Sequence, residues 1–99
     1  MAQIIWTEPA LDNIEDIAEY IAIHNIQAAK ALVEKIFSKV ERLNEFPESG
    51  KIPVELQGFN YREIVVTPCR IFYKLEHDNV YIIYVMRQEQ ELRKFILNH

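Results

Sequence analysis

The sequence predicts an α+β fold in which an N-terminal helical hairpin packs on a small twisted antiparallel sheet, in the order β-α-α-β-β-β. Apolar residues recur at intervals of three and four through residues 8–46, which is typical of amphipathic helices. Residues 61–86 instead form three β-prone runs separated by turn-forming residues. A chain of 99 residues is too short for two independently stable domains, so residues 1–99 are predicted to form one domain.

The chain opens with a short apolar run, residues 3–6, which we predict to be a strand at an edge of the sheet. Thr7 follows as the N-cap of the first helix, and Pro9 fits its first turn. The helix is expected to end near His24 and Asn25. Its apolar stripe consists of Leu11, Ile14, Ala18 and Ile21.

The second helix is predicted to begin near Ile26 and Gln27, only a few residues after the first. Such a short link places the two helices antiparallel, as a hairpin. The segment Phe46-Pro47-Glu48-Ser49-Gly50 ends the helical region, because Pro47 cannot continue a helix. The apolar stripe of the second helix consists of Leu32, Ile36, Val40 and Leu43.

The second half of the chain is predicted to form most of the sheet. Residues 51–60 are expected to be a loop, followed by strands at 61–67, 69–75 and 80–86. Thr67-Pro68 separates the first two strands, and residues 76–79 separate the second from the third. Short links make consecutive strands antiparallel. The tail, residues 88–97, is either a short helix or a loose arm.

Composition excludes several classes of function. Only 2 glycines are present, too few for a phosphate loop or a dinucleotide-binding fingerprint. The 3 histidines are far apart and Cys69 is the single cysteine, so we expect no metal and no cofactor. A lone cysteine indicates a reducing compartment. With no signal peptide and no long apolar run, we expect a cytoplasmic protein that does not enter the membrane.

The formal net charge of −4 argues against a general nucleic-acid binder, because phosphate contacts need a basic face. The charge is uneven along the chain. Residues 1–48 contain four basic and nine acidic residues, whereas residues 49–99 contain seven basic and six acidic ones. The net charge therefore does not argue against a local anion-binding site in the second half of the chain.

Three arginines, Arg62, Arg70 and Arg87, lie on or at the end of three successive predicted strands. Neighbouring strands are about 4.8 Å apart, so these guanidinium groups could converge on an anion or a carboxylate. The alternative, which spacing alone favours, is that each pairs with a nearby acid. The candidate partners are Glu63 or Glu76 for Arg62, and Glu89 or Glu91 for Arg87.

Alternation along a strand predicts which way Arg70 points. Arg70, Phe72 and Lys74 share one face, and the more apolar set of Ile71, Tyr73 and Leu75 shares the other. The apolar set is expected to face the helices, so Arg70 points to the opposite side, where a partner can reach it. The same alternation groups Arg87 with Val85, Ile83 and Tyr81.

Several segments together resemble the RelE/ParE superfamily of bacterial type II toxins, over nearly the whole chain. The segments that carry this resemblance are Ile5-Trp6-Thr7-Glu8-Pro9-Ala10-Leu11, Ile14-Glu15-Asp16-Ile17-Ala18-Glu19-Tyr20-Ile21, Phe46-Pro47-Glu48-Ser49-Gly50, Tyr61-Arg62-Glu63, Arg70-Ile71-Phe72-Tyr73 and Val80-Tyr81-Ile82-Ile83-Tyr84-Val85-Met86-Arg87. The resemblance implies a growth-inhibiting toxin neutralised by a cognate antitoxin. It also implies a helical hairpin on a twisted antiparallel sheet, in agreement with the prediction from the residues.

The superfamily has two main activities, and the resemblance implies different targets for each. RelE-like members are ribosome-dependent endoribonucleases that cleave mRNA, and ParE-like members inhibit DNA gyrase without an established reaction of their own. A third alternative is a non-toxic module that retains only antitoxin binding. A DNA-binding role without the antitoxin is not expected.

The residues favour the ParE-like branch. Arg62, Arg70 and Arg87 match basic positions of the nucleases and would be their catalytic candidates here. However, Ile64 stands where a second strand lysine is expected, and Met86 replaces a histidine common at the end of the last strand. Arg93 falls about where some nucleases carry a tyrosine. For a ParE-like toxin, the candidate target- or antitoxin-binding residues are Arg62, Arg70, Arg87, Arg93 and Tyr61.

Overall fold

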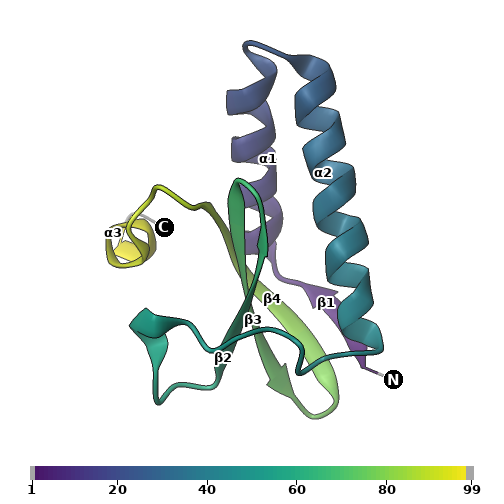
Figure 1. Ribbon diagram of the computed structural model, residues 1–99, viewed down its shortest axis with the longest axis vertical. Coiled ribbons are helices and arrows are strands. Elements are labelled where there is room, and N and C mark those ends of the chain that lie inside the picture. Colours follow the sequence, from purple (N-terminus) through teal and green to yellow (C-terminus); the bar gives the residue numbers. More distant parts are fainter. Residues whose placement is uncertain (1, 98–99) are drawn as a thin grey trace.

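The computed structural model describes residues 2–97 as two helices that stand on one face of a four-stranded sheet (Figure 1). In chain order the elements are β1 (Gln3–Trp6), α1 (Glu8–Ala22), α2 (Ile26–Glu41), the 3-10 turns η1 (Arg42–Asn44) and η2 (Val54–Leu56), β2 (Tyr61–Val66), β3 (Cys69–Glu76), β4 (Asn79–Arg87) and α3 (Leu92–Leu97). The predicted α+β class and element order are confirmed. The tail forms a short helix, the first of its two predicted alternatives.

Side-chain caps set the limits of the helical hairpin. The Thr7 hydroxyl accepts a hydrogen bond from the Ala10 amide at 3.4 Å, so Thr7 is the predicted N-cap of α1. The Asn25 side chain accepts from the Ala28 amide at 3.0 Å and caps α2. Because Asn25 has the extended backbone of an N-cap, α1 ends earlier than predicted, at Ala22. No helix within residues 2–97 is long and apolar enough to cross a membrane.

The sheet has the strand order β1-β4-β3-β2. Strands β2, β3 and β4 are antiparallel, as predicted, and β1 joins the sheet at the predicted edge. The sheet is mixed because β1 runs parallel to β4, with Gln3 opposite Asn79. The Thr7 hydroxyl donates to the Ile82 carbonyl at 2.6 Å, which holds the start of α1 against β4.

The connection between β3 and β4 is tighter than predicted. His77 and Asp78 both have positive φ, at 51° and 63°, so two residues complete the turn and the strands extend to Glu76 and Asn79. Aspartate tolerates this left-handed backbone better than most residues.

The main core lies between the hairpin and one face of the sheet, here called the hairpin face. Its most deeply buried side chains include Ile36, Val40, Leu43, Ile71, Tyr73, Val80, Ile82 and Val85. The opposite face, here called the far face, carries a second and smaller cluster. Phe72 and Met86 lie there, buried beneath Leu92 at the start of α3 and Leu56 of η2. The far face is therefore partly covered by the two short helical turns.

A bulge in β4 changes the direction of its last side chains. Tyr73 pairs with Ile82 and Phe72 pairs with Tyr84, which leaves Ile83 as an extra residue. Strict alternation, which groups Arg87 with Tyr81 and Ile83, is therefore wrong across this point. Val85 belongs to the core cluster on the hairpin face, and Arg87, two residues further, shares its face.

Candidate functional site

The sheet separates the arginines that the sequence suggested as a group. Arg62 lies opposite the core residue Tyr73, so it is on the hairpin face. Arg70 lies opposite Val65 and alternates with Ile71, so it points to the far face, as predicted. Arg87 is on the hairpin face at the end of β4. The alternative in which these three guanidinium groups converge on one anion is therefore wrong.

Arg70 forms ion pairs with two carboxylates on the far face. Its two terminal nitrogens donate to the Glu55 carboxylate at 2.8 and 2.9 Å. One of them also donates to Glu63 Oε2 at 2.6 Å, and Nε donates to Glu63 Oε1 at 3.2 Å. Both carboxylates are thus bound through both oxygens, the strongest arrangement available to a guanidinium group.

The cluster around Arg70 is largely buried. The exposed fraction of the side chain is 2% for Glu63, 16% for Arg70 and 42% for Glu55. The Phe72 ring lies 4.8 Å below the guanidinium carbon, and Lys51 Nζ is 4.0 Å from Glu63. Because η2 carries Glu55, the cluster also fastens the loop of residues 51–60 to the sheet.

The charges of Arg70, Glu55 and Glu63 compensate one another within the cluster. Hydrogen bonds from Arg70 lower the pKa of Glu55 from the usual 4.5 to about 2, so Glu55 stays ionised at neutral pH. The bonds to Glu55 and Glu63 in turn raise the pKa of Arg70. One cation faces two anions, and four hydrogen bonds occupy four of its five N–H donors. The group therefore offers little attraction to a phosphate.

Arg62 holds a loop instead of an acid. Its Nη1 donates to the carbonyl of Gly50 at 2.8 Å and to that of Glu48 at 3.2 Å. It forms no ion pair with Glu63 or Glu76, so the partners suggested by spacing are wrong for this residue. Arg62 thereby fixes the segment that follows the helical region.

Tyr73 fastens the same loop from inside the core. Its hydroxyl accepts from the Gly50 amide at 2.9 Å and donates to the Pro47 carbonyl at 2.8 Å. Burial raises the pKa of Tyr73, so the phenol stays protonated. A Cβ on Gly50 would lie 2.5 Å from the Tyr73 hydroxyl oxygen, which explains the glycine at this position.

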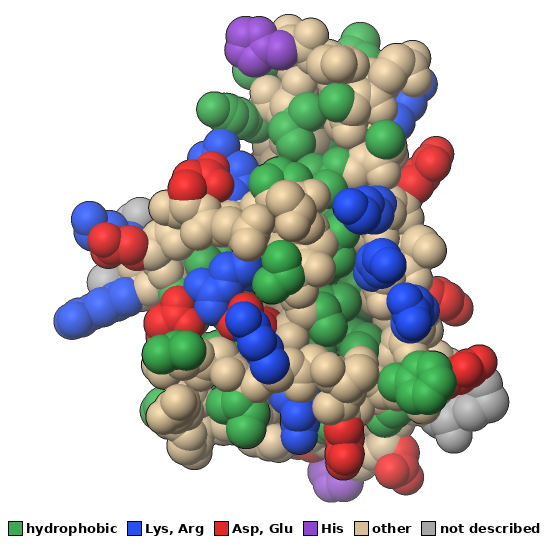
Figure 2. All heavy atoms as spheres, viewed as in Figure 1, with side chains coloured by type: hydrophobic (Ala, Val, Ile, Leu, Met, Phe, Trp, Pro, Cys, Tyr) green, Lys and Arg blue, Asp and Glu red, His purple; other side chains and the backbone are tan. Residues whose placement is uncertain are grey.

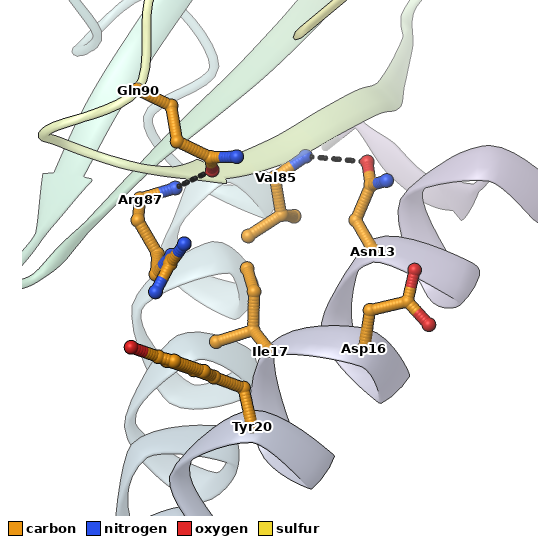
Figure 3. Close-up of a pocket in the computed structure, with 7 residues that line it drawn as sticks. All are labelled: Asn13, Asp16, Ile17, Tyr20, Val85, Arg87 and Gln90. Carbon is orange, nitrogen blue, oxygen red and sulfur yellow. Dashed lines mark hydrogen bonds between the residues drawn. The ribbon is translucent and has the colours of Figure 1, made fainter. Parts of the chain in front are cut away.

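Arg87 lines a small pocket between α1 and the end of β4 (Figure 3). Its guanidinium group lies over the Tyr20 ring at 4.3 Å, and Nε is 3.2 Å from Glu89, which confirms one of the two predicted partners. The Gln90 side chain accepts from the Arg87 amide at 3.0 Å. The pocket has a volume of about 110 Å³, well below the roughly 300 Å³ of a small-molecule site.

The remaining predicted site residues lie apart from these groups. Tyr61 is half-buried on the far face, opposite Lys74 and two residues before Glu63. Arg93 is exposed on α3 and forms no ion pair within the described part of the chain. Burial raises the pKa of the Cys69 thiol to about 11, so it is not an activated nucleophile. Among residues 2–97, no group of three histidine, cysteine or acidic side chains is arranged to hold a metal.

Sequence reasoning missed two residues that shape these sites, Glu55 and Asn13, and assigned a third, Glu63, to Arg62 instead of Arg70. Glu55 was part of an expected loop, and nothing in its neighbours indicates contact with Arg70. Glu63 could have been found, because a tight turn at residues 67–68 pairs residue 65 with residue 70 and places residue 63 on the same face. Asn13 lies on the apolar side of α1, and its side chain accepts from the Val85 amide at 3.0 Å, at the bulged part of β4 (Figure 3).

Comparisons with known proteins agree with this fold. Residues 4–92 match the family model described as "ParE toxin of type II toxin-antitoxin system, parDE". The chain is 32% identical over 68 residues to the toxin RelE2 of Caulobacter vibrioides, covering 69% of this chain and 73% of that protein. It is 34% identical over 89 residues to the protein Y4kP of Sinorhizobium fredii, covering 90% and 91%.

Two solved structures share the fold. A chain of the chromosomal ParDE toxin-antitoxin system from P. aeruginosa matches with a TM-score of 0.76 at 19% identity, covering 90% of this chain and 98% of that one. A chain of the RelB-RelE antitoxin-toxin complex from Methanococcus jannaschii matches with a TM-score of 0.54 at 16% identity, covering 95% of each.

Proposed function

The chain belongs to the ParE toxin family of type II toxin-antitoxin systems, within the wider RelE/ParE group, and from this premise we propose that it arrests growth by acting on DNA gyrase. We further propose that a cognate antitoxin neutralises it by direct binding. Because gyrase acts on DNA inside the cell, the proposal places the toxin in the cytoplasm.

The observation that carries the choice of gyrase over mRNA is the pairing of the cations on the far face. Lys51 and Arg70 face Glu63 and Glu55, and Lys74 Nζ is 3.3 Å from a Glu76 oxygen. Arg62 and Arg87 are on the other side of the sheet. A nuclease needs unpaired cations next to the scissile phosphate, whereas Lys51, Arg70 and Lys74 on this face are each paired with an acid.

A second candidate function is ribosome-dependent cleavage of mRNA. The identity to the toxin RelE2 and the fold shared with the RelB-RelE complex favour it. In that case Arg62, Arg70 and Arg87 would be the catalytic candidates. Their separation across the sheet and the side-chain bonds of Arg70 count against this alternative.

Two observations support an antitoxin partner. The structural matches are chains of toxin-antitoxin systems, one described as an antitoxin-toxin complex. The hairpin also exposes large apolar side chains, with exposed fractions of 60% for Ile26, 44% for Leu11 and 38% for Phe37. Such side chains are suited to a disordered segment that folds on binding. We therefore propose that the antitoxin contacts the hairpin and the sheet.

A pair of assays tests the proposal. Purified toxin is added to a gyrase supercoiling reaction and, in parallel, to translating ribosomes with a defined mRNA. We expect loss of supercoiling, restored by excess antitoxin, and uncut mRNA. Site-specific cleavage of mRNA with unchanged supercoiling would establish the second candidate. If expression of the chain causes no growth arrest and neither assay responds, the chain is a non-toxic antitoxin-binding module.

A further inference from the structure

A row of basic side chains runs along α2 into the first residue of η1, and we call it the α2 basic stripe. It consists of Lys35, Lys39 and Arg42, which follow one another at intervals of four and three residues and so share one side of the helix. All three are exposed, and none forms an ion pair within residues 2–97. Figure 2 shows basic side chains in a column where α2 lies in Figure 1.

No acid on the same helical segment neutralises the stripe. Residues 1–48 contain only four basic residues, and three of them form the stripe. The nearby acids, Glu34, Glu41 and Glu45, are exposed about a quarter of a turn away around the helix. Within the described chain they form no ion pair with the stripe, so its positive charge faces solvent without compensation.

The neighbouring helix α1 carries the opposite charge. It has acidic residues and no basic ones, and its acids are all exposed on the side away from its buried residues: Glu8, Asp12, Glu15, Asp16 and Glu19. Asp16 lies beside Val85 of β4, whereas Lys39 and Arg42 lie beside Val65 of β2. The hairpin is therefore acidic next to β4 and basic next to β2. A polyanion would orient such a molecule with the α2 basic stripe toward itself.

The length of the stripe fits a strand of DNA. Lys35 and Arg42 are seven residues apart, which corresponds to about 10 Å along the helix axis. One strand of a DNA duplex carries a phosphate about every 3.4 Å along its axis. The stripe therefore spans roughly three phosphates, and each of its three cations can face one of them.

The stripe is too small to hold DNA without help. Three phosphate contacts give weak binding, and the formal net charge of −4 opposes it further. A partner that already holds DNA changes this balance. Once the toxin is bound to that partner, the DNA is present at an effective concentration in the millimolar range, so a few weak contacts add measurable affinity.

We propose that the α2 basic stripe contacts the phosphate backbone of the DNA that gyrase holds, so that the toxin binds the gyrase–DNA complex more tightly than gyrase alone. The proposal rests on the proposed function, because gyrase is the enzyme that presents the DNA. Phosphate contacts carry no sequence information, so the contact is independent of base sequence. The even spacing of the stripe favours phosphates over the carboxylates of a protein surface, which have no regular repeat.

The test compares the affinity of fluorescently labelled toxin for gyrase with and without a linear DNA duplex, measured by anisotropy. We expect binding to be about tenfold tighter with the duplex, and much weaker to the duplex alone. The double change Lys35→Gln with Lys39→Gln should abolish most of this gain at unchanged Tm, because glutamine is also a good helix former. Its plot of log affinity against log salt for the gyrase–DNA complex should be shallower by about 1.8, or 0.9 for each lost phosphate contact.

The matched control is Lys30→Gln with Lys94→Gln, which removes two lysines outside the stripe and gives the same net charge. Both residues are exposed, and Lys30 lies on the other side of α2 from the stripe. This control should bind gyrase and the gyrase–DNA complex as the parent does, with the same dependence on salt. A loss equal to that of the Lys35→Gln, Lys39→Gln variant would mean that net charge alone sets the affinity, and it would overturn the proposal.

Three further outcomes would overturn the proposal. The first is parent-like binding of the Lys35→Gln, Lys39→Gln toxin to the gyrase–DNA complex. The second is an equal loss of its affinity for DNA-free gyrase, which would place the stripe on an acidic surface of the enzyme. The third is equally tight binding of the parent to the free duplex, since DNA would then be bound without gyrase.

The same measurements separate this inference from the proposed function. If the parent inhibits gyrase but gains no affinity from the duplex, only the inference about the α2 basic stripe fails. If the parent neither binds nor inhibits gyrase, the proposed target fails together with it.

Discussion

Removing the Arg70 guanidinium should destabilise the fold strongly, because it would leave a carboxylate buried without its main partner. The Glu63 side chain is only 2% exposed, and its two hydrogen bonds from side chains both come from Arg70, at 2.6 and 3.2 Å. Lys51 is a poor substitute, since its amine is 4.0 Å from the carboxylate and its side chain is 70% exposed. Breaking a buried pair from one side typically costs about 3–5 kcal/mol.

We therefore expect Arg70→Ala to lower the free energy of unfolding by about 3–5 kcal/mol, a large part of the roughly 5–15 kcal/mol of a typical domain. Replacing both partners, as in Arg70→Met with Glu63→Leu, removes the unpaired buried charge. This double variant should recover most of the lost free energy of unfolding. The measurement is urea unfolding followed by circular dichroism, with both midpoint and slope compared.

The control is Lys74→Ala, which breaks an ion pair whose side chains are 37% and 47% exposed. Pairs of this kind contribute about 0–1 kcal/mol, so the control should stay close to the parent. If Arg70→Ala also stays within about 1 kcal/mol, the reasoning about Glu63 is wrong. In that case the carboxyl group is either protonated or hydrated in the variant, and the double change should bring no recovery.

Three further changes test the contacts described above. Arg70 holds the pKa of Glu55 at about 2 in the folded chain against its usual 4.5, so the carboxylate stabilises the fold above about pH 4.5 and this contribution is lost as the pH falls toward 2. Melting temperatures across that range should fall less for Glu55→Gln than for the parent. Gly50→Ala places a methyl group 2.5 Å from the Tyr73 hydroxyl oxygen and should cost about 1–3 kcal/mol in urea unfolding. Asn13→Ala leaves a buried strand amide without its acceptor and should also cost about 1–3 kcal/mol; a loss below about 0.5 kcal/mol would mean that water replaces the side chain.

The parts of the fold that local pattern determines could be predicted from the sequence. The stripe of the second helix, the N-cap Thr7 and the β-prone runs each depend on neighbouring residues, and the structure confirms them. The stripe of the first helix is only partly right, because Leu11 is 44% exposed and the buried side of α1 consists of Ala10, Asn13, Ile14 and Ile17. The face on which Arg70 lies follows from alternation along β3, which has no irregularity before it. These features need no knowledge of distant contacts.

The parts that depend on distant contacts could not be predicted. Glu55 reaches Arg70 because Lys51 pairs with Glu63 and Leu56 packs on the far-face cluster, and both contacts are tertiary. The extra residue at Ile83 has no composition signal, since apolar residues flank it on both sides, yet it turns Arg87 toward α1. The positions of the arginines on successive strands could therefore be predicted, but their convergence on one anion was wrong.

The parallel pairing of β1 with β4 constrains when the protein can fold during its own synthesis. The ribosome makes β1 and both helices first, but Thr7 donates to Ile82, a residue 75 positions later in the chain. The apolar face of the hairpin must likewise wait for Val80 and Val85 before it is covered. While β4 is still inside the ribosome, the apolar face of the helical hairpin therefore stays exposed to solvent. The native fold can therefore form only after β4 has emerged from the ribosome.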